Sequence, residues 1–170
     1  MKYIVLSDSH GYINNAIDVL ERFKDEAEGF IHLGDCCTDA EYLHSKFSHM
    51  RWYSVAGNND YVGQAPAKAI AHIGGKKIVM VHGHKQRVSY GVMTLSYLGM
   101  EEGAAAVLFG HTHRPFIEYE GNTALFNPGS ISLPRSTDKP TFGIMNIGEN
   151  IRFDIYMYDP NGADKFIKIY

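Results

Sequence analysis

The chain has 170 residues, of which 45% are hydrophobic and 21% charged, and its formal net charge is −3 with the histidines neutral. This length fits one domain over 1–170, and the composition is that of a globular protein rather than a disordered one. The weak negative charge excludes a general attraction to nucleic acid or to anionic lipid. A phosphate-bearing ligand would therefore need local positive charge, which a bound metal ion can supply.

Three features indicate the compartment. The first residues contain only a short apolar run, Ile4-Val5-Leu6, which does not make a signal peptide. No apolar stretch approaches the about 18 residues of a membrane span. Cys36 and Cys37 are adjacent, and vicinal cysteines rarely pair. We expect a cytoplasmic protein whose thiols are small buried groups rather than a redox pair.

The first 60 residues alternate between strand and helix patterns. Short apolar runs rich in β-branched residues predict strands at 2–7, 30–33 and 52–56. Between them, apolar residues at helical spacing predict an amphipathic helix over 12–27 and a weaker one over 39–48. This βαβαβ order implies a parallel sheet with right-handed crossovers.

The remainder of the chain is rich in strand patterns. Strands at 67–73 and 76–81 form an expected hairpin around Gly74-Gly75, and a helix is expected over 88–101. Five further strands are expected at 105–109, 115–120, 123–127, 140–147 and 151–158. Two sheets packed face to face, with the helices outside, would bury both halves of the chain.

Five of these strands end in polar turns marked by glycine. The turns are Asp8-Ser9-His10-Gly11, Gly34-Asp35, Gly57-Asn58, His82-Gly83-His84 and Gly110-His111-Thr112-His113. If the strands are parallel neighbours, their carboxyl ends share one edge of the sheet, which is where ligands bind in open α/β folds. The glycines would let each backbone turn sharply, with left-handed angles where required.

These turns combine the side chains that bind transition metals. Carboxylate, amide oxygen and imidazole are ligands for Mn²⁺, Fe and Zn²⁺. A single ion in a tetrahedral site takes about four ligands, so this larger set of converging donors suits two ions. Two cations about 3.5–4 Å apart can hold a phosphoryl group and activate a shared water, with one carboxylate bridging them.

Taken one at a time, the motifs have ordinary explanations. Asp8-Ser9-His10 could be a helix N-cap beside a surface histidine, and Gly57-Asn58 could be a plain turn. The pair His111 and His113 is the strongest single motif, and the joint pattern, in order and always after a strand, favours metal. The remaining histidines are expected in supporting, structural or surface positions: His32 in the core behind the ligands, and His44, His49 and His72.

With these residues the chain resembles the calcineurin-like metallophosphoesterase superfamily, whose pattern is D-x-H, G-D, G-N, a later H with G-H, and G-H-x-H. The resemblance covers about 8–130, and the short length and Asn127-Pro128-Gly129-Ser130 make the chain similar to the small YfcE-type phosphodiesterases. The resemblance implies an α/β fold of four layers, an αββα sandwich of two mixed β-sheets flanked by helices.

The resemblance also implies the ligand sets. It places one ion on Asp8, His10, Asp35 and His113, and a second on Asp35, Asn58, His82 and His111, so that Asp35 bridges the two. Mn²⁺ is the metal that the resemblance favours, with Zn²⁺, Fe and Ni²⁺ as alternatives.

The expected activity is hydrolysis of a small phosphate ester, with a diester favoured, by a water held between the two ions. Asn58 and His84 are the candidates for stabilising charge in the transition state. The chain departs from many family members at Asn59, where they carry the histidine that is taken to protonate the leaving group. His84 or solvent could deliver that proton, and an activated leaving group such as an aryl alcohol would need none.

Other functions stay open at this point. The fold also serves as a scaffold in the retromer subunit of the superfamily, although that subunit lacks part of the ligand set that is complete here. Phosphomonoesterases and protein phosphatases usually carry the histidine that is absent at Asn59. A nuclease would need a basic groove, of which the sequence gives no sign.

The sequence names candidate walls for a substrate pocket but not the substrate. These walls are the loops near Tyr12 and at 61–66, 84–90 and 131–138. Arg87 and Arg135 are candidate phosphate contacts, although a solvated surface arginine is the commoner case. Whether the chain forms a homo-oligomer is left open.

Overall fold

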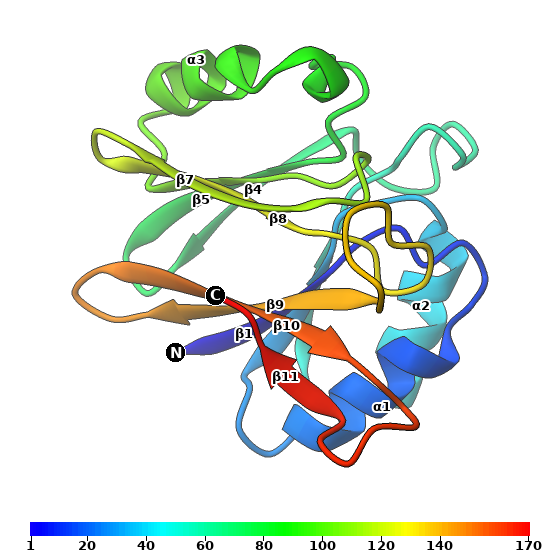
Figure 1. The fold of residues 1–170 in the computed structure, drawn as a ribbon. Coiled ribbons are helices and arrows are strands. Elements are labelled where there is room, and N and C mark those ends of the chain that lie inside the picture. The colour runs from blue at the N-terminus through cyan, green and yellow to red at the C-terminus, as the bar shows by residue number, and fades with distance from the viewer.

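The computed structural model describes residues 1–170 and contains two β-sheets and three α-helices (Figure 1). The first elements alternate as predicted: β1 (Lys2–Leu6), α1 (Asn14–Phe23), β2 (Gly29–His32), α2 (Cys37–Lys46) and β3 (Arg51–Ser54). The middle of the chain forms β4 (Lys68–Ile73), β5 (Lys76–Val81), the 3-10 turn η1 (Val88–Tyr90), α3 (Met93–Glu102) and β6 (Ala106–Leu108). The last elements are β7 (Pro115–Glu120), β8 (Thr123–Pro128), β9 (Thr141–Ile147), β10 (Ile151–Tyr158) and β11 (Phe166–Lys168).

Both sheets are mixed. The first has the strand order β11-β10-β9-β1-β2-β3, and the second has the order β4-β5-β6-β8-β7. In the first sheet β1, β2 and β3 are parallel, while β9 runs antiparallel to β1. In the second sheet β5, β6 and β8 are parallel, and β4 and β7 pair antiparallel at its edges. The parallel strands of each sheet therefore end at a common edge.

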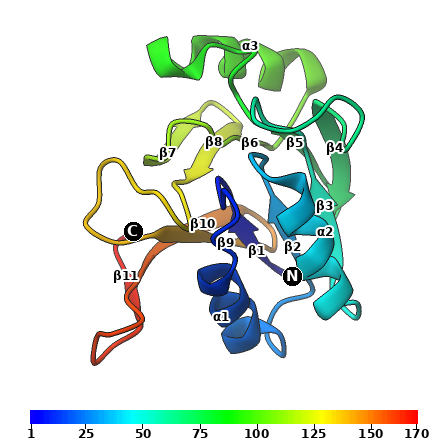
Figure 2. The ribbon, with the colours of Figure 1, turned by 90° about the vertical axis from the view of Figure 1, so that its right-hand side faces the viewer.

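The elements form four layers (Figures 1 and 2), and three clusters of apolar side chains hold these layers together. Val5 and Ile31 of the first sheet and Phe126 of the second belong to the cluster between the sheets. α1 and α2 cover the outer face of the first sheet and share one apolar cluster with it. α3 covers the outer face of the second sheet through another apolar cluster. This arrangement is the expected αββα sandwich. No helix of the chain is both long enough and apolar enough to cross a membrane.

The helices and the last strand differ in part from the expectation. α1 ends at Phe23 because the chain turns there, with the Glu26 N–H donating to the Phe23 carbonyl at 2.9 Å. The helix expected over 88–101 is interrupted at Gly91, whose φ of 144° separates η1 from α3. β11 was not predicted, since its three residues are too few for a periodic signal and its pairing with β10 is a tertiary contact.

Candidate metal centre

The polar turns converge between the two sheets rather than along the edge of one. Asp8, Asp35 and Asn58 follow β1, β2 and β3 of the first sheet, whereas His82 and the pair His111 and His113 follow β5 and β6 of the second. The expectation of a single shared edge is therefore wrong, because the five strands divide between two sheets. The sandwich nevertheless places both edges on the same side of the molecule.

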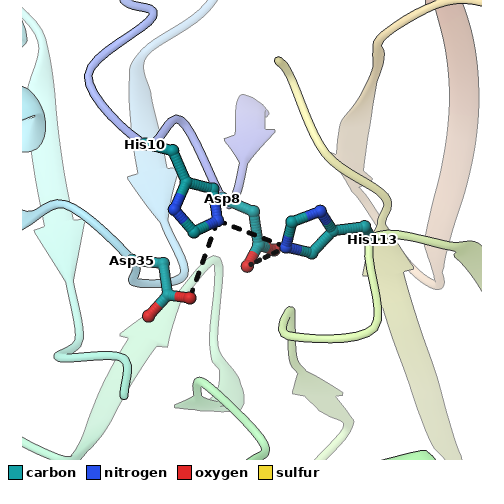
Figure 3. Close-up of side chains that lie close together, drawn as sticks. All are labelled: Asp8, His10, Asp35 and His113. Carbon is teal, nitrogen blue, oxygen red and sulfur yellow. Dashed lines mark hydrogen bonds and ion pairs between the residues drawn. The ribbon is translucent and has the colours of Figure 1, made fainter. Parts of the chain in front are cut away.

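Four of the predicted ligands form one tight group. The ligand atoms of Asp8, His10, Asp35 and His113 all lie within 4.8 Å of one another (Figure 3). His113 Nε2 lies 3.3 Å from Asp8 Oδ1 and 3.3 Å from His10 Nε2. His10 Nε2 lies 3.7 Å from Asp35 Oδ2. This group has the same members as the first ligand set expected from the sequence.

The second group surrounds His82. Its Nε2 atom lies 3.1 Å from Asn58 Oδ1 and 3.4 Å from Asp35 Oδ1. The ring of His111 stands 5.2 Å from the ring of His82, in an edge-on orientation. Asp35 therefore faces both groups, with Oδ2 toward His10 and Oδ1 toward His82.

Backbone carbonyls fix the orientation of two imidazoles. His82 Nδ1 lies 2.7 Å from the Leu33 carbonyl oxygen, and His113 Nδ1 lies 2.6 Å from that of Leu133. A carbonyl oxygen can only accept, so each Nδ1 must carry the hydrogen, and each Nε2 is the atom that faces the centre. Metal-binding histidines are oriented by such hydrogen bonds to backbone carbonyls.

The centre brings lone pairs together without donors between them. Asp8 is fully buried, and its Oδ1 atom has no hydrogen-bond partner. Its other oxygen accepts hydrogen bonds from the Ser7 hydroxyl at 2.5 Å and the His111 N–H at 3.1 Å. A buried carboxylate oxygen without a donor is costly, and a cation at this point removes the cost. The residues present therefore fit divalent metal.

The backbone at the centre is held in an unusual conformation. Among the non-glycine residues with positive φ are Asp8, His10, Asp35, His111 and His113, with values between 48° and 67°. Such a conformation costs about 1–2 kcal/mol per residue, and it persists at functional sites where the surroundings enforce it. The sequence had predicted that glycines would absorb these angles.

Gly57 instead provides space. A Cβ atom there would lie 2.0 Å from Asp35 Oδ1, which is far closer than a real contact allows. The turn glycines were expected to take left-handed angles where required: Gly34 has a positive φ of 97°, whereas Gly57 has none and instead permits the close approach of Asp35.

The electrostatics of the centre attract positive charge. Burial alone would raise the pKa of Asp35, but contact with His82 and the N–H groups of Asn59 hold that pKa well below its usual range. Burial alone would lower the pKa of His82, but Asp35 and Asp8 together raise it, and Asp8 in the same way raises the pKa of His113. The carboxylates thus bind positive charge, which histidine protons supply unless a cation does.

Asn59 and His84 occupy defined places beside the ligands. The Asn59 side-chain amide donates to Asp35 Oδ2 at 2.7 Å, and its backbone N–H donates to Oδ1 at 3.0 Å, so Asn59 positions that carboxylate. His84 lies next to the second group, with its ring 5.4 Å from the ring of His82 and 6.2 Å from that of His111. Its Nδ1 atom is buried and has no hydrogen-bond partner.

Several supporting residues were not identified from the sequence. Asp60 accepts four backbone hydrogen bonds, from Asp35, Cys36, Cys37 and Gly57, at 2.6–3.0 Å. The predicted turn Gly57-Asn58-Asn59-Asp60 contained this residue, but a turn carboxylate gives no sign of its partners. In the motif Asn127–Ser130, Ser130 donates to the Asp8 carbonyl and Asn127 to the Gly110 carbonyl, both at 2.8 Å.

The remaining histidines lie where the sequence suggested. His32 is fully buried behind the ligands, with Nε2 3.0 Å from the Ser9 hydroxyl. His44 stacks on Trp52 at 4.7 Å, and His49 and His72 are exposed. None of them belongs to the groups of side chains described above.

Known proteins share this fold. Residues 1–150 match the family described as the calcineurin-like phosphoesterase superfamily domain. The probable metallophosphoesterase YsnB of Bacillus subtilis is 29% identical over 165 residues, which cover 96% of this chain and 94% of the relative. Phosphodiesterase YfcE of Escherichia coli is 25% identical over 169 residues, which cover 86% of this chain and 88% of the relative. The solved structure of Entamoeba histolytica Vps29 complexed with Zn²⁺ has a TM-score of 0.78 at 22% identity, over 99% of this chain and 98% of that one, a likeness of fold.

Proposed function

The chain belongs to the calcineurin-like phosphoesterase superfamily, and from this premise we propose that it hydrolyses phosphate diesters with the help of two divalent metal ions. The coarser assignment, a metal-dependent phosphoesterase, is supported by the family and by the buried cluster of Asp and His side chains. The observation that carries the proposal is the convergence of two carboxylates and two imidazoles within 4.8 Å around an Asp8 oxygen that has no donor.

The ligand sets follow from the two groups of side chains. Asp8, His10, Asp35 and His113 would hold one ion, and Asp35, Asn58, His82 and His111 would hold the other. When bound, such ions polarise phosphoryl oxygens and lower the pKa of coordinated water. Mn²⁺ is our first choice for a site of carboxylate, amide and imidazole donors, with Zn²⁺, Fe and Ni²⁺ as alternatives.

The chain's own residues contribute orientation and hydrogen bonds. The Leu33 and Leu133 carbonyls keep the Nε2 atoms of His82 and His113 turned toward the centre. The Asn58 amide is at an exposed position, and its NH₂ group can donate to a phosphoryl oxygen. His84 can donate another hydrogen bond, which would stabilise charge that develops in the transition state.

Asn59 is the reason that we favour a diester. Its amide is engaged with Asp35, and an amide does not deliver a proton to a leaving group. Diesters with an acidic leaving alcohol need no such proton, whereas monoesterases of the superfamily usually have a histidine at this position. The name of the YfcE relative, a phosphodiesterase, points the same way.

The test compares two aryl esters on one preparation. Protein freed of metal with EDTA and supplied with Mn²⁺, Zn²⁺, Fe²⁺ or Ni²⁺ should hydrolyse bis(p-nitrophenyl) phosphate faster than p-nitrophenyl phosphate. Asp35→Asn should lower kcat/KM by about 1,000-fold or more, because a neutral amide replaces the two anionic oxygens between the ions. Asp25→Asn, at an exposed position after α1, is the matched control.

Two results would contradict the proposal. A folded Asp35→Asn protein with near-normal turnover would show that the centre does not act as described. A chain that binds metal but hydrolyses neither ester would instead act as a scaffold of the same fold.

A further inference from the structure

A cavity of about 670 Å³ lies at the second sheet, and its wall is formed by neighbours in the chain of the metal ligands rather than by the ligands themselves. Its wall includes Thr112, which lies between His111 and His113 in the chain, and the segments 88–92 and 135–136. Arg135 is joined directly to the centre, since its N–H donates to the His113 carbonyl at 3.1 Å. The candidate walls 84–90 and 131–138 thus do contribute to a cavity beside the centre, whereas Tyr12 and 61–66 are not part of it.

The surroundings of this cavity are cationic in a chain that is negative overall. The residues that line the cavity include two arginines and no Asp or Glu, and Lys85 and Arg87 precede its first lining residue, whereas the whole chain has a net charge of −3. Arg114 and Arg135 both line the cavity. Neither guanidinium forms an ion pair or a hydrogen bond with another side chain, so both are free to bind an anion.

Arg135 connects the cavity to the metal ligands, because it lines the cavity while its backbone N–H donates to the His113 carbonyl. An anion held by the Arg135 guanidinium would therefore lie near the centre but outside the groups of carboxylates and imidazoles.

The rest of the wall mixes small polar side chains, such as Ser89 and Ser136, with aromatic ones. Phe109 and Val88 are buried at its base, and Phe116 meets Phe109 edge-on with ring centroids 5.9 Å apart. Tyr90 lines the same cavity and is 92% exposed, so its ring is open to a ligand. A planar group can lie against such rings while guanidinium groups pair with phosphate through two parallel hydrogen bonds.

We propose that this cavity binds one alcohol arm of the diester, and that this arm combines a planar ring with a second phosphate held by Arg114 and Arg135. The inference rests on the proposed function, because the reacting phosphate is the one at the metal centre. A volume of about 670 Å³ lies within the usual 300–1,000 Å³ of a small-molecule site, which is ample for a sugar, a ring and a phosphate.

Two matched substrates test the inference. Thymidine 5′-(p-nitrophenyl phosphate) and its 3′-phosphorylated form release the same aryl alcohol and differ only in the second phosphate. We expect the Mn²⁺-loaded chain to favour the 3′-phosphorylated form by about tenfold or more in kcat/KM, the usual range for a charge-assisted contact. Arg114→Gln and Arg135→Gln should each move this ratio toward one. Arg152→Gln, an exposed arginine on β10 in the other sheet, should leave the ratio unchanged.

A binding measurement separates failure of this inference from failure of the proposed function. Calorimetric titration of the Mn²⁺-loaded chain should show thymidine 3′,5′-bisphosphate binding about tenfold more tightly than thymidine 5′-phosphate, and Arg114→Gln should remove the difference. If neither ester is hydrolysed, the proposed function fails and this titration still decides whether the cavity binds a second phosphate. Equal binding of both nucleotides, or a substrate ratio near one in the wild-type chain, would overturn the inference.

Discussion

Replacing Asp60 with asparagine should loosen the metal centre without touching a ligand. Oδ1 of Asp60 accepts the N–H groups of Cys36 and Cys37 at 2.9 and 2.6 Å, and Oδ2 accepts those of Asp35 and Gly57 at 3.0 and 2.7 Å. One carboxylate thus joins the turn after β2 to the turn after β3. It also holds Asp35 in its left-handed conformation, with φ of 57°.

The size of the effect follows from the number of donors. Asparagine keeps one acceptor oxygen, so in either orientation two of the four N–H groups face an NH₂ group instead. Each N–H that loses its acceptor costs about 1–3 kcal/mol, and the site is half-buried, so we expect a loss of about 2–3 kcal/mol in the free energy of unfolding. Because the free energy of unfolding of a domain is typically about 5–15 kcal/mol, the variant should remain folded at 25 °C. Displacement of Asp35 should weaken metal binding by about 10–100-fold, as for other residues that orient ligands.

Urea unfolding of the metal-free chain and calorimetric titration with Mn²⁺ measure the two effects. Asp25→Asn, at an exposed site, should change the free energy of unfolding by less than about 0.5 kcal/mol. The reasoning would be refuted if Asp60→Asn matched that control in both measurements, because the four N–H groups would then have no need of the carboxylate.

The pH dependence of the Asp60 effect has a defined sign. Burial alone would raise the pKa of Asp60, but the N–H groups of Gly57, Cys37 and Cys36 hold it below its usual value. Stability from a lowered pKa is present above the unfolded value of about 3.9 and is lost as pH falls through the folded pKa. The difference between wild type and Asp60→Asn should therefore stay constant from about pH 5 to 8 and shrink only in stronger acid.

Three further predictions concern the centre itself. Mn²⁺ at about 1,000 times its dissociation constant should stabilise the chain by about 4 kcal/mol, which corresponds to a rise in Tm of roughly 8–16 °C. Thermal unfolding with and without EDTA measures this rise, and an unchanged Tm would exclude a metal site in the folded chain. Burial alone would lower the pKa of His82 and His113, but Asp35 and Asp8 raise it, so a metal ion must displace protons and its affinity should rise between about pH 6 and 8. Titration in two buffers of different ionisation enthalpy would detect the released protons, and a pH-independent affinity would contradict the assignment. Gly57→Ala should cost about 3 kcal/mol and abolish metal binding, because its Cβ would lie 2.0 Å from Asp35 Oδ1 and 2.4 Å from the Asp35 nitrogen. Gly148→Ala, with nothing within 4 Å of the added Cβ, should behave as wild type, and equal behaviour of the two variants would show that Asp35 can move aside.

The predicted ligand turns could be found because the signal for each is local. Asp8, Asp35 and His82 each follow a short apolar run within one or two residues, and a strand cannot continue through the glycine-marked turns that contain them. For Asp8, Asp35 and Asn58, the alternation of strands and helices in the first half also indicated a common direction, since parallel strands joined by helices end at a common edge.

What the sequence did not reveal depends on contacts between distant residues. Whether β3 or β6 is the neighbour of β5 is decided by packing, and the split of the five strands into two sheets follows from that choice. The role of Asp60 is of the same kind, because three of its four donors lie 23–25 residues away in the chain. The cavity beside the centre joins residues from η1, β7 and the 135–136 segment, which no local pattern connects.

The strained backbone of the ligand turns indicates whether the fold or the metal sets the geometry of the centre. Five predicted ligands have φ between 48° and 67°, and each such residue costs about 1–2 kcal/mol relative to a relaxed loop. Asp8 also leaves a buried oxygen without a donor, so the apolar core between the sheets must hold the turns against both costs. A cation that satisfies Asp8 and the inward-facing Nε2 atoms would remove the electrostatic cost without moving the backbone. We therefore interpret the two sheets as setting the ligand geometry before metal arrives, so that binding stabilises turns that are already formed.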